Sequence, residues 1–209
     1  MRARREASSA GLRCSELHWS ELHHGIDPAE VPLLGRWLRL MWLLARPLVV
    51  ARVPPNAISL LGALCAVGAF VAGHPVLSLA GVFVAVLCDG LDGAVALLAD
   101  RASRAGARVD AIADRIADVA FAGILWRFGA PWWLALLAAI AAVVLELTRM
   151  LRGGEVLARI TVAERPSRVV CTVLALLSAT VSVQSWPQAL CASILLGLCV
   201  IGIAQLAAP

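Results

Sequence analysis

The chain has 209 residues, of which 61% are hydrophobic and 15% are charged, and its mean hydropathy is +0.86. Soluble domains are usually about half apolar, so this composition argues against a soluble globular domain and indicates a membrane protein. The formal net charge is +4 and all 18 basic residues are arginine. No nucleic-acid-binding motif occurs, so we expect no nucleic-acid partner, and we expect the arginines to face anionic membrane lipid.

The first 26 residues are polar and of mixed charge, and no apolar segment follows their arginines directly. This pattern does not fit a signal peptide, and we interpret residues 1–26 as a polar cytoplasmic tail. Asp27, Pro28 and Glu30 are residue types that favour the start of a helix, as a cap, a first helical residue and a capping-box carboxylate.

The segment that follows is amphipathic at helical spacing. Four apolar residues fall on one face: Trp37, Met41, Leu44 and Leu48. We therefore predict an interfacial amphipathic helix over residues 27–53, lying along the membrane surface. The alternative is a first membrane-spanning helix, which Arg36, Arg39 and Arg46 would make costly in lipid.

The rest of the chain, residues 54–209, contains six apolar segments of roughly membrane-spanning length. They run over residues 56–73, 76–99, 105–128, 131–150, 167–184 and 187–207, and Gly and Pro residues separate most of them. We predict an all-α integral membrane fold, with six transmembrane helices preceded by the interfacial helix and with residues 54–209 as a single membrane domain.

Arginines are distributed unequally between the two sides of this arrangement. The loops on the side of the N-terminal tail carry five of them: Arg101, Arg104, Arg152, Arg159 and Arg165. The opposite side carries only Arg127. By the positive-inside rule, we expect both termini to be cytoplasmic.

Carboxylates interrupt the second and third apolar segments, where an unpaired charge is costly in lipid. Helical spacing puts one set on a single face of the second segment: Asp89, Asp92, Gly93 and Ala96. It puts another set on a single face of the third: Gly106, Asp110 and Asp114. If the two helices fold antiparallel about a turn near Arg101, Asp92 lies level with Asp110, and Asp89 lies level with Asp114.

Four carboxylates in one cluster cannot all stay ionised without cations. Because every ligand is oxygen, we predict Mg²⁺ (or Mn²⁺), and four carboxylates suit two ions, an arrangement used for displacement at phosphorus. A proton relay in a transporter would also bury aligned carboxylates. Pairing with arginine could explain one or two of the aspartates. Asp118 lies on the same helix face, four residues after Asp114, and we interpret it as the partner of a structural hydrogen bond.

The segment from Asp89 to Asp114 resembles the signature of the CDP-alcohol phosphatidyltransferases, D-x2-D-G-x2-A-R-x8-G-x3-D-x3-D. Every defined position except the Arg, which is Leu97 here, recurs with the same gaps. The pattern of an interfacial helix and six spans also resembles this family, so the likeness covers nearly all of the chain after the tail.

The resemblance implies a reaction and roles for the aspartates. Asp89, Asp92, Asp110 and Asp114 would hold two metal ions, and Asp114 would also act as the general base on the acceptor hydroxyl. The acceptor oxygen would attack the β-phosphorus of a CDP-linked donor, and CMP would leave.

The resemblance also implies donor-binding residues. The segment Pro55-Asn56-Ala57-Ile58-Ser59 is similar to the P-N-x-x-[ST] element that contacts the CDP moiety in the family, although Asn56 could serve only as a helix cap. The donor set is Asn56, Ser59, Gly93, Ala96, Ser103 and Gly106. The family's Arg binds the nucleotide diphosphate, so Leu97 puts donor affinity in question, and Arg101 or Arg104 would have to substitute for it.

Four arginines near the same predicted cytoplasmic side are candidates for the acceptor. Arg149 and Arg152 end the fourth apolar segment, and Arg165 and Arg168 open the fifth. Together they would form a cationic pocket for a phosphorylated alcohol, in segments that resemble those of phosphatidylinositol phosphate synthases. The alternative interpretation is membrane anchoring by lipid-facing arginines.

These features predict a CDP-alcohol phosphatidyltransferase of the bacterial cell membrane, with its active site facing the cytoplasm. It would move a phosphatidyl group from CDP-diacylglycerol to an alcohol, such as inositol phosphate or glycerol 3-phosphate, in phospholipid biosynthesis. The resemblance also implies a homodimer. The alternatives are a catalytically weakened relative that binds lipid or a partner protein, and a transporter.

Overall fold

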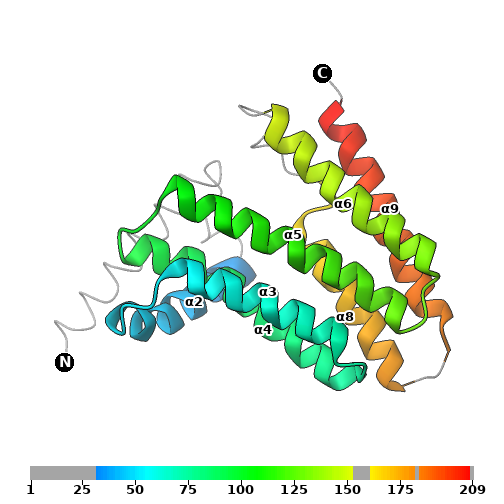
Figure 1. The fold of residues 1–209 in the computed structure, drawn as a ribbon, viewed down its shortest axis with the longest axis horizontal. Coiled ribbons are helices and arrows are strands. Elements are labelled where there is room, and N and C mark those ends of the chain that lie inside the picture. Colours follow the sequence, from blue (N-terminus) through cyan, green and yellow to red (C-terminus); the bar gives the residue numbers. More distant parts are fainter. Residues whose placement is uncertain (1–31, 153–160, 182–183, 208–209) are drawn as a thin grey trace.

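The computed structural model describes residues 32–152, 161–181 and 184–207. The polar tail over residues 1–26 and the helix start at Asp27–Glu30 lie outside the described residues. Within the described ranges the chain forms helices and no strands, so this part of the molecule is all-helical, as predicted (Figure 1). The helices are α2 (Pro32–Val50), α3 (Pro55–Val71), α4 (Pro75–Leu98), α5 (Arg104–Arg127), α6 (Trp132–Arg152), α8 (Arg165–Val181) and α9 (Trp186–Ala207).

The six predicted apolar segments correspond to the six helices α3, α4, α5, α6, α8 and α9. Local chemistry explains several of the helix boundaries. Pro55 and Pro75 lie in the first turn of α3 and α4, where the N–H that proline lacks has no helical partner anyway. Gly73 connects α3 to α4 with a φ of +65°, a conformation that suits glycine. Ser103 caps α5, and its Oγ accepts a hydrogen bond of 3.0 Å from the N–H of Gly106.

The described helices pack around three clusters of buried apolar residues, and α5 and α8 each contribute to two of them. Helix α3 packs against α4 and α5, α6 packs against α9, and α8 contacts α4, α5 and α9 (Figure 1). Alanine dominates the core between α3, α4 and α5: Ala66, Ala69, Ala85, Ala117 and Ala120. Such small side chains let helix backbones approach closely, which is how helices associate where lipid provides no hydrophobic driving force.

Among the described helices, α4, α6 and α9 are long and apolar enough to cross a membrane. Helices α3 and α8 have only 17 residues each, and α5 carries the charged residues of the motif together with several arginines. Helices α2 and α3 meet at an angle of 119°, and they add a fourth span if they form one broken helix. The six spans and the interfacial position of α2 therefore stay predictions.

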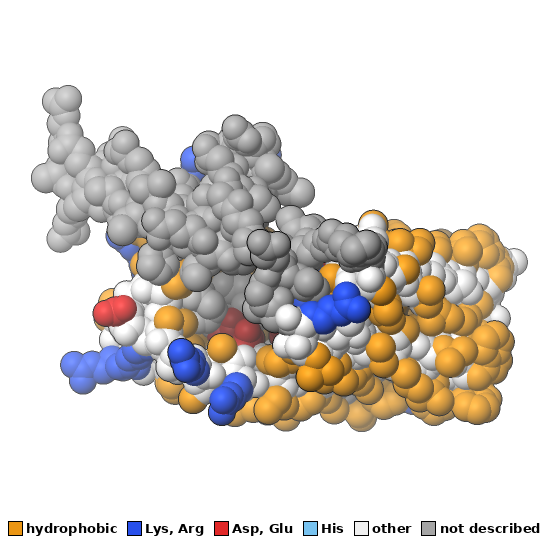
Figure 2. Space-filling view, turned by 90° about the horizontal axis from the view of Figure 1, so that it is seen from above, with side chains coloured by type: hydrophobic (Ala, Val, Ile, Leu, Met, Phe, Trp, Pro, Cys, Tyr) orange, Lys and Arg blue, Asp and Glu red, His pale blue; other side chains and the backbone are white. Residues whose placement is uncertain are grey.

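The surface is divided between apolar and charged regions. Figure 2 shows hydrophobic side chains over the half of the molecule in which α5 ends and α6 begins. The arginines seen in this view gather away from that end. This polarity is typical of a helical bundle with one end in lipid and one end at a membrane surface.

Helix α2 packs against α4 beside the aspartate motif. Met41, Trp42 and Ala45 are buried there. Leu44, predicted to share a face with Met41, is 38% exposed, because the contact with α4 is centred on Met41 and Ala45. At Gly90 a Cβ atom would lie 2.7 Å from the Met41 Sδ, so glycine allows α2 to lie directly on the motif.

The close approach of α3 and α4 depends on Gly81. A Cβ atom there would lie 2.8 Å from the Ala69 Cβ and 3.1 Å from the backbone oxygen of Cys65. We expect Gly81→Ala to lower the free energy of unfolding by about 1–3 kcal/mol, as overpacking does, because α3 is also held by α5 and cannot simply shift. Thermal unfolding in detergent measures this loss.

The matched control is Gly68→Ala in α3. In the described structure no atom lies within 4 Å of a Cβ atom added there. This variant should be neutral or slightly stabilising, because alanine favours a helix more than glycine does. Equal losses of stability in the two variants would contradict the proposed packing.

Candidate functional site

Helices α3, α4, α5 and α8 meet around a small polar cavity. Its volume is about 10 Å³, which suits a single water molecule or ion. All four aspartates of the motif line it: Asp89, Asp92, Asp110 and Asp114. Ser59 from α3 and Arg165 from α8 complete its polar lining. The antiparallel folding of the second and third apolar segments therefore brings the four carboxylates together, as the sequence predicted.

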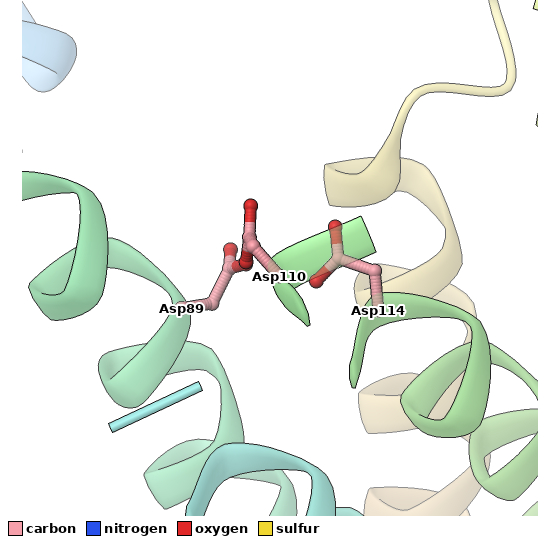
Figure 3. A group of neighbouring side chains, drawn as sticks. All are labelled: Asp89, Asp110 and Asp114. Carbon is pink, nitrogen blue, oxygen red and sulfur yellow. The ribbon is translucent and has the colours of Figure 1, made fainter. Parts of the chain in front are cut away.

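Three of the carboxylates form the tightest group. Asp89 on α4 and Asp110 and Asp114 on α5 each present an oxygen atom, and these atoms lie within 4.8 Å of one another. Figure 3 shows the three side chains pointing toward a common space between the two helices. One divalent ion could contact all three carboxylates after small side-chain movements.

Asp92 lines the same cavity but is held by local hydrogen bonds. It is only 6% exposed. The hydroxyl of Ser59 donates to its Oδ2 at 2.5 Å, and the backbone N–H of Gly93 donates to its Oδ1 at 2.6 Å. Ser59, predicted to contact the donor, thus also fixes the orientation of a candidate metal ligand.

Three residues of the predicted donor set lie together where α3 and α5 begin. A Cβ atom on Gly106 would lie 3.1 Å from the Ser103 Oγ and 3.3 Å from the Asn56 Oδ1, so these three residues are neighbours. Gly93 is exposed, with no described atom within 4 Å of where its Cβ would be, and Ala96 is partly exposed one turn further on. The absence of a side chain at Gly93 leaves its backbone open to a ligand, whereas at Gly106 it allows Ser103 and Asn56 to lie close to the helix backbone.

Leu97 occupies the position of the motif Arg and is partly buried. Arg101 and Arg104 are exposed on either side of Ser103, in the turn and at the start of α5. Neither of them is among the described residues that line the aspartate cavity. A substitute for the motif Arg would therefore act at the rim of the site.

The four arginines predicted for the acceptor have separate environments, and all four lie in the described part of the chain. Arg165 enters the aspartate cavity, where its Nη1 donates to the Oδ1 atoms of Asp89 and Asp114. Arg149 pairs with Glu164 on the loop before α8, at 2.7 Å. Arg152 donates to the backbone oxygen of residue 206, at the end of α9.

Arg168 does not offer its guanidinium to a ligand. It is 2% exposed and pairs with Asp118 of α5 and with Glu146 of α6, the latter at 2.7 Å. The prediction that it binds the acceptor therefore changes to a positioning role, because both ends of its guanidinium contact protein carboxylates. Asp118 forms the structural hydrogen bond expected for it.

Sequence reasoning missed the network around Arg168. Glu146 pairs with Arg115, Arg149 and Arg168, so it connects α5, α6 and α8. A signal was present, since Glu146 is the one acidic residue in an otherwise apolar segment, and an ionisable residue inside a span usually has a partner.

The carboxylates that line the cavity fit a hard divalent cation. Among the described lining residues the candidate metal ligands are all carboxylate oxygens, and neither His nor Cys is present. Oxygen ligands favour Mg²⁺ or Mn²⁺ over softer metals. A guanidinium at the centre of the cluster is a further sign that the site requires positive charge.

Comparisons with known proteins agree with this site. The profile of the CDP-alcohol phosphatidyltransferase family matches residues 52–204. The fold is similar to the crystal structure of Mycobacterium tuberculosis phosphatidylinositol phosphate synthase (PgsA1) in complex with manganese and citrate, with a TM-score of 0.66, 25% identity, and coverage of 79% of this chain and 86% of that one. It is also similar to the structure of the same enzyme with CDP-DAG bound, with a TM-score of 0.67, 25% identity, and coverage of 80% and 91%. No curated protein sequence matches the chain.

Proposed function

The chain belongs to the CDP-alcohol phosphatidyltransferase family, and from this premise we propose that it transfers a phosphatidyl group from CDP-diacylglycerol to a phosphorylated polyol. The observation that carries the proposal is the convergence of Asp89, Asp92, Asp110 and Asp114 on one cavity beside Asn56, Ser103 and Gly106. The similar mycobacterial enzyme binds manganese in one structure and CDP-DAG in another. This supports both the metal-binding role of the carboxylates and the donor-binding role of the residues beside them.

In the proposed reaction, Asp114 removes the proton from the acceptor hydroxyl. The acceptor oxygen forms a bond to the β-phosphorus of the donor, and the bond from that phosphorus to the CMP oxygen breaks. Asp89, Asp92, Asp110 and Asp114 would hold two divalent ions, Mg²⁺ or Mn²⁺, which neutralise the diphosphate and the departing CMP when bound. The Ser59 hydroxyl keeps the Asp92 carboxylate oriented for this role.

The donor nucleotide would lie at the shared end of α3, α4 and α5. Asn56 and Ser103 offer hydrogen-bonding groups there, packed against Gly106, and Gly93 and Ala96 present small surfaces that leave room for it. Backbone N–H groups at the start of α3 and α5 favour an anionic ligand. Arg101 and Arg104 lie beside this region in sequence and would supply charge in place of the motif Arg.

For the acceptor, Arg165 is the arginine that the cavity geometry favours. Its guanidinium lies next to Asp114, the proposed base, so a phosphate bound to it would bring a neighbouring hydroxyl within reach. Arg149 and Arg152 would form the outer wall of this pocket at the end of α6. Arg168 would position α8 beneath it through Asp118 and Glu146.

We place the protein in the bacterial cell membrane, with six spans, α2 at the interface, and the active site and both termini in the cytoplasm. The arginine distribution supports this orientation, and the 119° bend between α2 and α3 supports a surface position for α2. Homodimerisation is part of the proposal and rests on the family resemblance.

A panel of acceptors tests the proposed substrate class. Purified protein in detergent would receive CDP-diacylglycerol, Mn²⁺ and one of inositol 1-phosphate, glycerol 3-phosphate, serine or free inositol. We expect CMP release with a phosphorylated acceptor and not with its unphosphorylated counterpart. Release with serine or free inositol would reject the assignment of Arg165. The weakened-relative alternative would be favoured if the folded wild type releases no CMP with any acceptor and the Leu97→Arg variant does release CMP.

Gly106 should be essential for donor binding. We expect Gly106→Ala to raise the KM for CDP-diacylglycerol about 10–100-fold, the effect of about 1–3 kcal/mol of overpacking, because its Cβ would press on Ser103 and Asn56. Steady-state kinetics measure this value. The matched control is Gly197→Ala in α9, where no described atom lies within 4 Å, and a similar KM increase in both variants would contradict the donor assignment.

A further inference from the structure

Arg165 occupies an unusual place for a residue that would bind the acceptor. Its Nη1 donates to two carboxylates at once, Asp89 on α4 and Asp114 on α5. Both of these carboxylates belong to the group of three whose oxygens lie within 4.8 Å of one another. The guanidinium therefore takes up one oxygen atom of each of two carboxylates that a divalent ion would use as ligands.

The electrostatics of the cavity explain this placement. Four aspartates line a space of about 10 Å³ in which Arg165 provides the one basic side chain among the described lining residues. Clustered carboxylates repel one another strongly unless a cation lies between them. A guanidinium is always protonated and can donate to two carboxylates at once, so it can serve as that cation.

From these contacts we propose that Arg165 and the divalent cations are alternative occupants of the carboxylate cluster. Without metal, Arg165 neutralises Asp89 and Asp114. Metal binding displaces the guanidinium, which then becomes free to bind the anionic group of the acceptor. The acceptor site would thus form only after the metal has bound. This inference rests on the proposed function of the cluster as a metal site.

The position of Arg165 on the fold supports an exchange of this kind. It is the first residue of α8, next to the loop that carries Glu164 and Ala163, so its side chain can move without disturbing a helix interior. Arg168, one turn later, is 2% exposed and fixed by Asp118 and Glu146. Helix α8 is therefore held by Arg168, and Arg165 can leave the cluster while the helix stays in place.

Manganese binding measured without donor or acceptor tests the proposal. Free Mn²⁺ would be followed by electron paramagnetic resonance during titration of the wild type, Arg165→Gln, Arg165→Lys and Arg127→Gln. We expect Arg165→Gln to bind Mn²⁺ about tenfold more tightly or better, because a competing charge within hydrogen-bond distance of the ligands is gone. Arg165→Lys keeps the charge, and its Mn²⁺ affinity should lie between those of the wild type and Arg165→Gln.

Arg127→Gln is the matched control, since it removes the same charge at the exposed far end of α5. Its Mn²⁺ affinity should stay within about twofold of the wild type, because exposed charges that distant are screened. Equal or weaker Mn²⁺ binding by a folded Arg165→Gln, or an equal gain in Arg127→Gln, would overturn the proposal. If Arg165→Gln does not fold, Mn²⁺ binding by Arg165→Lys that is weaker than that of the wild type would overturn it.

Phosphate binding tests the second half of the exchange. Inorganic phosphate should bind the wild type in the presence of Mn²⁺ and not in its absence, and Arg165→Gln should lose this Mn²⁺-dependent binding. Phosphate binding that is unchanged in Arg165→Gln would reject the release of Arg165 toward an anion. Neither measurement involves phosphatidyl transfer, so a protein that shows the exchange but releases no CMP would reject only the proposed reaction.

Discussion

Replacing Asp114 by asparagine should lower the rate of CMP release by about a thousandfold or more. The substitution keeps the shape of the side chain but removes both the proposed base and one negative metal ligand. Loss of a positioned general base alone typically costs about 10²–10⁴-fold, and loss of a metal ligand adds to it. The measurement is CMP release from CDP-diacylglycerol with saturating Mn²⁺ and acceptor, alongside thermal unfolding to confirm the fold.

Asp100→Asn provides the matched control for this result. Asp100 lies in the turn between α4 and α5, is exposed, and has a φ of +52°. Asparagine tolerates this left-handed conformation as well as aspartate does. The control variant should therefore keep the wild-type rate. Wild-type activity in Asp114→Asn would remove Asp114 from the reaction.

Replacing Arg168 by methionine should destabilise the fold by about 3–5 kcal/mol, the usual cost of removing one partner of a buried ion pair. Asp118 is only 4% exposed, and it would lose its closest cation. Glu146 would lose its 2.7 Å partner but keep Arg115 and Arg149 nearby. Thermal unfolding in detergent should show a large fall in Tm.

A double variant separates the ion pair from the packing of the side chain. Arg168→Met combined with Asp118→Leu removes both charges, and buried pairs replaced by apolar groups are often close to neutral. We expect the double variant to be more stable than Arg168→Met alone. Its loss of stability should therefore be smaller than the sum of the losses in the two single variants. Arg127→Met, at an exposed arginine, serves as the surface control. Strictly additive losses would show that the Arg168–Asp118 contact contributes nothing.

Much of the fold could be predicted because its signals are local. Proline, glycine and serine mark the boundaries of α3, α4 and α5 in the sequence itself, and the structure begins these helices at Pro55, Pro75 and Arg104, directly after Ser103. The meeting of the four aspartates could also be predicted, because equal distances from one turn fix which residues of an antiparallel pair lie level.

Other features depend on how helices rotate and on which helix packs beside which. Leu44 and Met41 are close on a helical wheel, yet only the contact of α2 with α4 decides that Met41 is buried and Leu44 is exposed. The same holds for the arginines. Arg165 and Arg168 are one turn apart, and the placement of α8 beside α4 and α5 sends one into the aspartate cavity and the other to Asp118 and Glu146.

Metal-dependent CMP release by the wild type tests the central claim most directly. The purified protein would receive CDP-diacylglycerol and the phosphorylated acceptor, with Mg²⁺ or Mn²⁺ in one sample and EDTA in the other. We predict that CMP and a new phospholipid form in equal amounts with metal, that EDTA abolishes both, and that added metal restores them. CMP release that persists in EDTA, or a folded metal-bound protein that never releases CMP with any acceptor, would contradict a metal-dependent phosphatidyltransferase built on the four aspartates.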